Sequence, residues 1–304
     1  MTITFALLRQ VLIMLLLAGI GCAMFRAGKI SAEGSKCLGN ILIWLSLPCV
    51  IIKSFLTERS QLRLTGLLIS AAAAAVLLLL SLLVSRIIFR KDPVASFAAA
   101  FSNPGFFGVP LILVTLSDGD VFYIAAFIAF LNLLQWTYGV TLLTGRRSAR
   151  DPKALLKTPF LAAIGIGMFF FLSGIPMPGI LLESVGFMAN LNTPLAMFVT
   201  GVYLAQTNIP GMFRNTRLYL ISAVRLILIP ALSILALSLI PNVWLELKTA
   251  VLIAASCPVG SNVAVYAQLH DKNYPYAVET VVISTLLSIL TIPLAVQAAS
   301  ILWS

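Results

Sequence analysis

Long apolar runs separated by short polar joints extend along almost the whole chain. A helix needs about 20 mostly apolar residues to cross the hydrocarbon of a bilayer, and these runs reach that length. They are too long and too uniformly apolar for the tilted strands of a membrane barrel. The pattern predicts an all-α integral membrane protein with ten spans. The expected spans lie near residues 4–25, 37–56, 64–88, 94–116, 120–143, 158–174, 185–206, 216–240, 247–269 and 275–301.

Composition agrees with this pattern, because 60% of the 304 residues are hydrophobic, 10% are charged and the mean hydropathy is +1.05. The first apolar run, 5–25, lacks a basic leader, so we expect it to be a helix rather than a cleaved signal peptide. The net charge of +10 would suggest a nucleic-acid partner in a soluble protein. Here the positive-inside rule explains it, and no nucleic-acid partner is predicted.

The densest basic cluster lies between the fifth and sixth expected spans. It consists of Arg146, Arg147, Arg150, Lys153 and Lys157. Loops rich in lysine and arginine stay in the cytoplasm, so this joint is predicted to be cytoplasmic. Alternation along the chain then places both termini outside. We expect a multi-pass protein of the cell (cytoplasmic) membrane, with lipid around it.

Similar residues recur in the two halves of the chain. The matched pairs are Gly19 with Gly165, Gly21 with Gly167, Gly28 with Gly174 and Pro48 with Pro194 at a spacing of 146 residues, and Pro104 with Pro258 at 154. These matches predict two five-helix repeats, residues 1–150 and 151–304. Because five is odd, the second repeat enters the membrane from the opposite side, which is the inverted-repeat architecture of secondary transporters.

The fourth and ninth expected spans contain helix-breaking residues near mid-membrane. Proline removes a backbone donor and glycine lowers helix preference, so unbroken helices are not expected there. Unwound backbone at this depth must face protein or a water-filled cavity, and half-helix N-termini attract anions. Simple packing kinks are the alternative interpretation. The predicted substrate-binding residues at the breaks are Asn103, Pro104, Gly105, Gly108, Pro258, Gly260, Ser261 and Asn262.

Other polar residues inside the expected spans have two interpretations each. Asn132 and Gln135 share one helix face and either line the substrate cavity or form hydrogen bonds between helices. Arg225 either attracts an anionic substrate or extends its side chain toward the headgroups. Glu279 either couples protons or lies at the membrane interface. Arg225 and Glu279 are therefore candidates for charge coupling.

The two breaks carry a family resemblance. Asn103-Pro104-Gly105-x-x-Gly108-x-Pro110 and Pro258-x-Gly260-x-Asn262 resemble the paired crossover segments of the auxin efflux carrier family, which includes the plant PIN carriers and bacterial relatives. Arg225-Leu226-x-x-x-Pro230 and the segment 192–205 are also similar to that family.

The resemblance implies that spans four and nine cross at their breaks. It also implies that spans 1, 2, 6 and 7 form a scaffold against which spans 3–5 and 8–10 move as an elevator. A homodimer would form through the scaffold helices. The implied substrate is a small organic anion, such as a malate-like or auxin-like carboxylate.

Other function classes lack the residues that they need. No nucleophile with a base, no paired carboxylates and no metal-ligand cluster falls at bilayer depth, so neither an enzyme, a metal site nor a cofactor is predicted. The interpretation is a secondary transporter of a small organic anion. The alternatives are a sodium-coupled organic-anion symporter of the bile-acid type and a membrane sensor.

The orientation can be tested with reporter fusions at Arg150 and after Ser304. We expect the two reporters to lie on opposite sides of the membrane, because five spans separate them. A cytoplasmic reporter at both positions would contradict the ten-span prediction and the inverted repeat with it.

Overall fold

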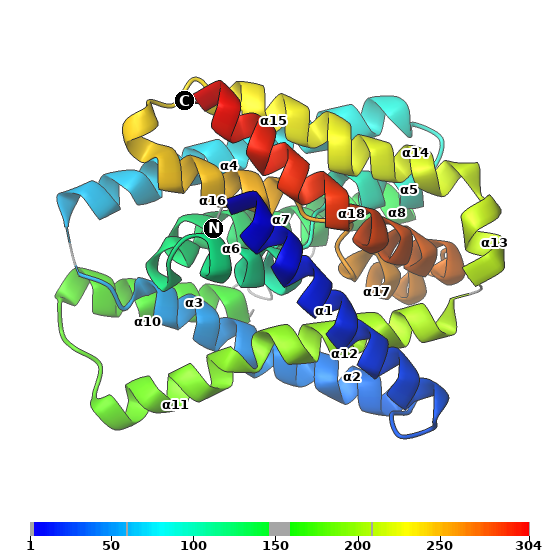
Figure 1. Ribbon diagram of the computed structural model, residues 1–304, viewed down its shortest axis with the longest axis horizontal. Coiled ribbons are helices and arrows are strands. Elements are labelled where there is room, and N and C mark those ends of the chain that lie inside the picture. Colours follow the sequence, from blue (N-terminus) through cyan, green and yellow to red (C-terminus); the bar gives the residue numbers. More distant parts are fainter. Residues whose placement is uncertain (1–2, 59, 146–158, 208, 304) are drawn as a thin grey trace.

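The computed structural model describes residues 3–58, 60–145, 159–207 and 209–303, and all regular elements among them are helices (Figure 1). Seven helical stretches within these ranges are long and apolar enough to cross a membrane. They are Thr4–Arg26, Ala32–Phe55, Gln61–Ile88, Gly119–Thr144, Gly179–Gln206, Thr216–Leu237 and Tyr274–Trp303. Pro104–Thr115 and Pro159–Ser173 are shorter apolar helices.

Several of these stretches combine consecutive helices. The α-helices are α1 (Ile3–Arg26), α2 (Ala32–Ile41), α3 (Leu47–Phe55), α4 (Gln61–Ile88), α5 (Pro93–Ala100), α6 (Val109–Thr115), α7 (Ala125–Leu134), α8 (Val140–Thr144), α10 (Pro159–Ser173), α11 (Gly179–Asn190), α12 (Asn192–Gln206), α13 (Ile209–Arg214), α14 (Thr216–Ala223), α15 (Ile229–Leu237), α16 (Leu245–Ser256), α17 (Asn262–Leu269) and α18 (Tyr274–Trp303). Four π-helical turns are η1 (Leu42–Ser46), η2 (Pro104–Gly108), η4 (Gln135–Gly139) and η5 (Val224–Leu228), and two 3-10 turns are η3 (Asp118–Ile124) and η6 (Asn242–Trp244).

The all-α membrane fold predicted from the sequence is confirmed in this form. The seven long stretches coincide with the first, second, third, fifth, seventh, eighth and tenth expected spans. The other three expected spans correspond to short or broken helices, namely α5 to α6, α10, and α16 to α17. The five basic residues of the central joint lie outside the described residues, so the count of ten spans stays a prediction.

Prolines explain three of the π-helical turns. Pro48, Pro110 and Pro230 each lie just after such a turn, and the residue four positions before each proline is inside the turn. A proline ring clashes with the carbonyl of that residue, and a wider turn moves the carbonyl away. The helices therefore continue past these prolines with local widening instead of stopping.

Glycine permits α1 and α12 to cross at backbone contact. A Cβ atom on Gly201 would lie 2.1 Å from the Ala18 carbonyl oxygen, and one on Gly21 would lie 2.8 Å from the Phe198 Cα. Membrane helices pack most closely where small residues let their backbones meet. The α1–α12 crossing therefore depends on glycine, which has no Cβ atom, at positions 21 and 201.

The helices form two groups by their contacts, and the groups meet where α1 packs on α18 and α6. In one group, α1 packs on α12, and α3 packs on α10 and α11. In the other, α4, α5, α7 and α14 to α18 pack on one another. Figure 1 shows α2, α11 and α12 along the lower side of the molecule and α14 and α15 along the upper side, while α1 runs diagonally from beside α18 to the lower right.

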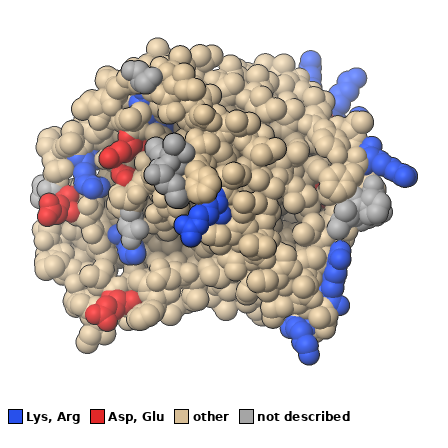
Figure 2. All heavy atoms as spheres, viewed as in Figure 1, with Lys and Arg blue, Asp and Glu red and all other residues tan. Residues whose placement is uncertain are grey.

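Charge is distributed unevenly along the molecule. On the face drawn in Figure 2, Lys and Arg extend from the right-hand end, where Figure 1 places α13, while Asp and Glu gather toward the opposite end. The chain repeatedly runs between these two ends. A basic end and a mixed end are the distribution expected of a protein whose two membrane faces follow the positive-inside rule.

The α1–α12 crossing makes a testable prediction about stability. Gly201→Ala should destabilise the fold by about 1–3 kcal/mol, because the added methyl group overlaps backbone that cannot move aside easily. Its melting temperature in detergent should fall. The control is Gly186→Ala in α11, where a Cβ meets no atom within 4 Å. That substitution should leave the melting temperature unchanged or raise it, and equal behaviour of the two variants would contradict the packing argument.

Candidate functional site

The two predicted helix breaks meet in an antiparallel pairing. Between α5 and η2 the chain is extended through residues 101–103, and between α16 and α17 it is irregular through 257–261. Ser102 and Val259 form an isolated β-bridge, and the Gly260 N–H donates to the Phe101 carbonyl at 2.9 Å. The backbone groups that the breaks release from helix hydrogen bonding are therefore partly paired with each other, as buried polar groups require.

Gly260 is required by the closeness of this pairing. A Cβ atom there would lie 2.8 Å from the Ser102 carbonyl oxygen. The neighbouring Val259 N–H donates to the Ser284 hydroxyl of α18 at 3.1 Å. Gly105, in the turn η2 at the other break, has a similar role, because a Cβ atom there would lie 2.9 Å from the Leu47 side chain. The glycines of the breaks thus allow backbone segments and neighbouring helices to approach.

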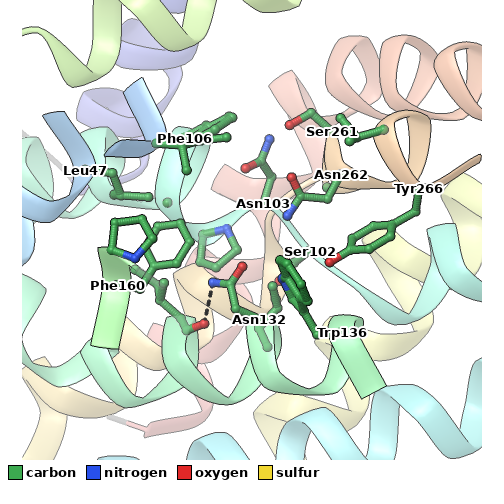
Figure 3. Close-up of a pocket in the computed structure, with 18 of the residues that line it drawn as sticks. Leu47, Ser102, Asn103, Phe106, Asn132, Trp136, Phe160, Ser261, Asn262 and Tyr266 are labelled. Atoms are coloured by element: carbon green, nitrogen blue, oxygen red, sulfur yellow. Dashed lines mark hydrogen bonds between the residues drawn. The ribbon is translucent and has the colours of Figure 1, made fainter. Parts of the chain in front are cut away.

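A cavity of about 390 Å³ lies beside the crossing (Figure 3). Its polar side chains are those of Ser102, Asn103, Asn132, Ser261, Asn262 and Tyr266. Its larger apolar walls come from Trp44, Leu47, Phe106, Trp136, Phe160 and Leu269, among others. No Asp, Glu, Lys, Arg or His is among the described residues that line it. The cavity is therefore mostly apolar and carries neutral hydrogen-bonding groups.

Three asparagines supply much of that hydrogen-bonding capacity. Figure 3 shows Asn103 and Asn262 next to each other at the crossing, with Asn132 below them on α7. The Asn262 amide donates to the Gln135 Oε1 at 2.8 Å, and the Asn132 amide donates to the Ile128 carbonyl at 2.7 Å. Each of these bonds uses one of the two amide N–H groups, so the second N–H and the amide oxygen of each side chain remain available. Within the described chain, the Asn103 side chain forms no hydrogen bond.

Most of the predicted substrate-binding residues line this cavity. They are Asn103, Pro104, Gly105, Asn132, Gly260, Ser261 and Asn262. Gly108, Gln135 and Pro258 do not line it. Gln135 is fully buried, and its Oε1 accepts a hydrogen bond from the Asn262 amide of a different helix. Gly108 packs instead against Cys257, with 3.1 Å between its Cβ position and the sulfur.

The two charge-coupling candidates lie outside the cavity. Arg225 is only 1% exposed, so it does not extend toward the headgroups. Its guanidinium donates to the carbonyls of Ala99 and Ala100 at 3.2 and 3.1 Å and also to that of Ala255. Glu279 is half-buried near the start of α18.

Sequence reasoning missed the aromatic walls of the cavity. Trp136 follows Asn132 by four residues, and Tyr266 follows Asn262 by four, so each aromatic shares a helix face with an asparagine. Their rings lie 6.5 Å apart between centroids, nearly perpendicular. This repeated spacing of an asparagine and an aromatic residue was a usable signal, whereas nothing in the sequence connects Trp44 or Phe160 to the site.

The crossing also touches the first group of helices. Asn192, at the start of α12, donates from its amide to the Gly105 carbonyl at 3.1 Å and is 2% exposed. Leu47 of α3 packs on the same glycine. In the part of the chain that the structure describes, no three His, Cys, Asp or Glu residues are placed to hold a metal ion.

Two comparisons relate the chain to known membrane transport proteins. A family model described as "Membrane transport protein" matches residues 6–296. A protein of Rhizobium meliloti (strain 1021) named "Putative malonate transporter" is 26% identical over 280 residues, which cover 86% of this chain and 85% of the relative. The match extends over all the helices that form the crossing and the cavity. The chain belongs to the membrane transport protein family, as its resemblance to the auxin efflux carriers predicted.

Proposed function

We propose that this protein is a secondary transporter that carries a small carboxylate and holds it in the cavity beside the crossing. The observation that carries this proposal is the meeting of two broken helices at an apolar cavity with three asparagines. Unwound backbone at membrane depth is typical of transporter substrate sites. Asparagine amides can donate to a carboxylate while the site itself carries no fixed charge that would have to be desolvated.

The shape and chemistry of the cavity favour a small anion with an apolar part. A volume of about 390 Å³ is at the low end of ligand sites. The N-terminal ends of the helices that begin at Pro104 and Asn262 border the cavity and carry partial positive charge. The aromatic walls suit the hydrocarbon part of the substrate. The name of the Rhizobium meliloti relative makes malonate the first dicarboxylate to test.

Ten spans in two inverted repeats explain further features of the chain. Gly28 and Gly174, a predicted pair, both follow a helix and have nearly equal positive φ angles of 69° and 67°. Gly21 packs on α12, while its partner Gly167 packs on Phe55 of α3, 2.8 Å from its Cβ position. Thus span one contacts span seven as span six contacts span two. This exchange of partners is what two repeats related by a two-fold axis would produce.

The proposed movement is an elevator in which α4 to α8 and α14 to α18 slide against a scaffold of α1 to α3 and α10 to α12. The grouping of contacts supports this division. During the movement, the Asn192 amide would release the Gly105 carbonyl and Leu47 would leave the glycine. The movement would also have to replace the packing of α1 on α18 and α6 with equivalent packing, so that the two end states stay close in free energy.

The conformation of the chain corresponds to an inward-facing state in this proposal. The exposed residues of the cavity lining include Trp44, Val265 and Leu269, and Leu269 ends α17 close to the basic end of the molecule. If that end lies on the cytoplasmic side of the inner membrane and both termini lie outside, a solute would reach the asparagines from within the cell.

Alanine substitutions of Asn103 and Asn262 test the site. Each removes an amide that can donate to the carboxylate, so each should weaken binding by about 1.5–3 kcal/mol, or roughly ten- to a hundredfold. Binding is measured on purified protein as the rise in melting temperature with malonate, malate or indole-3-acetate, because a ligand of the folded state raises apparent stability.

The matched control is Asn190→Ala. Asn190 is an exposed asparagine at the end of α11 and does not line the cavity at the crossing. If the Asn103 and Asn262 variants fold and bind the carboxylate as tightly as the wild type, the crossing is not the substrate site.

A further inference from the structure

Arg225 bridges the ends of the two broken helices from behind the crossing. Ala99 and Ala100 end α5, and Ala255 is the penultimate residue of α16. The guanidinium donates to the carbonyls of all three. The C-terminal carbonyls of a helix carry its partial negative charge, about half an elementary charge per helix. One arginine therefore faces the negative ends of both half-helices.

The charge of Arg225 has no carboxylate partner among the residues that the structure describes. Among the described residues, an ion pair joins Arg217 to Asp92 at 3.4 Å, but it lies on the surface and does not involve Arg225. A buried charge without an ion-pair partner is costly, and such residues in membrane proteins usually serve a function. Helix-end carbonyls compensate the guanidinium only in part, because they are dipoles. The crossing consequently keeps an excess of positive charge.

Helix-end carbonyls of this kind are cation ligands in many transporters. Where broken helices form a substrate site, unwound carbonyls and half-helix C-terminal ends coordinate the coupling sodium ion. Here the guanidinium is bonded to these carbonyls. Several buried hydroxyls nearby in the sequence have no hydrogen-bond partner among the described residues. They belong to Ser96, Ser102, Ser222 and Ser256.

We propose that Arg225 is a built-in cation that occupies the place of a coupling sodium ion and makes the crossing selective for anions. This inference rests on the proposed carboxylate site. It predicts that substrate binding is independent of sodium, because the guanidinium of Arg225 already supplies a positive charge at this place. It also predicts that removing the guanidinium uncovers the carbonyl oxygens of Ala99, Ala100 and Ala255, between which a small cation can enter.

The expected effect on affinity follows from the separation of the charges. Three extended residues lead from Ala100 to Asn103, so the guanidinium and a bound carboxylate lie on the order of 10 Å apart. At an effective dielectric constant of about 20, two unit charges at that distance change binding by roughly tenfold. A loss of this size is readily measured.

The experiment compares Arg225→Gln and Arg225→Lys with the wild type in potassium and in sodium buffers. The probe is whichever of malonate, malate and indole-3-acetate raises the melting temperature of the wild type most. Arg225→Lys keeps the charge and should bind within a few-fold of the wild type. Arg225→Gln should bind roughly tenfold more weakly in potassium and should recover affinity in sodium. A merely structural role of Arg225 would produce no recovery by sodium.

The control is Arg217→Gln, because the Arg217 side chain is 72% exposed. It should bind the probe as the wild type does in both buffers. Sodium-dependent binding by the wild type would overturn the inference, and this result can be obtained even if Arg225→Gln fails to fold. Unchanged binding by a folded Arg225→Gln would also overturn it.

The Asn262→Ala variant separates this inference from the proposed function. If Asn262→Ala weakens binding while Arg225→Gln does not, the carboxylate site stands and the built-in cation is wrong. If neither variant changes binding, or if no carboxylate in the panel stabilises the wild type, the proposed site fails and the inference fails with it.

Discussion

The constraint on which the rest of this structure depends is that backbone polar groups buried in a membrane must be paired. Two apolar helices break beside each other, and neither break would be stable against lipid. Each supplies part of what the other needs, through the Ser102–Val259 bridge and the bond from Gly260 to Phe101. Arg225 then takes up carbonyls at the ends of α5 and α16. The crossing is therefore one unit, and the cavity lies beside it.

Close approach of backbone segments is the second requirement. Glycine permits it both at the pairing of the two breaks and at the crossing of α1 and α12. Gly260 lets the two breaks pair, and Gly201 lets α1 meet α12. A side chain at either position would push apart segments that no other residue could reconnect. Small residues thus shape both parts of the proposed elevator. The two parts meet where α1 packs on α18 and α6, and where Asn192 bonds to the Gly105 carbonyl.

The sequence predicted much of the fold and much of the site, for identifiable physical reasons. Apolar runs predicted the spans because membrane burial acts on every residue of a helix, and Pro104, Gly105, Pro258 and Gly260 predicted the breaks because proline and glycine act locally. Attraction of an anion was one of two interpretations of Arg225, but its hydrogen-bond partners were not predicted. Its depth in the span was evident, but its partners are main-chain carbonyls. Every residue has such a carbonyl, so the sequence does not indicate which ones an arginine will bind. The same is true of the wall residues Trp44 and Phe160, which reach the cavity only through packing.

Counterflow in reconstituted vesicles tests the central claim most directly. Proteoliposomes loaded with the unlabelled carboxylate that binds best are placed in a trace of the labelled compound. Alternating access at the crossing predicts a transient, saturable accumulation of label, which protein-free vesicles do not show and which Asn262→Ala weakens. Entry of label at the rate of protein-free vesicles would contradict the account, because a protein that binds a carboxylate without exchanging it across the membrane is not a transporter of it.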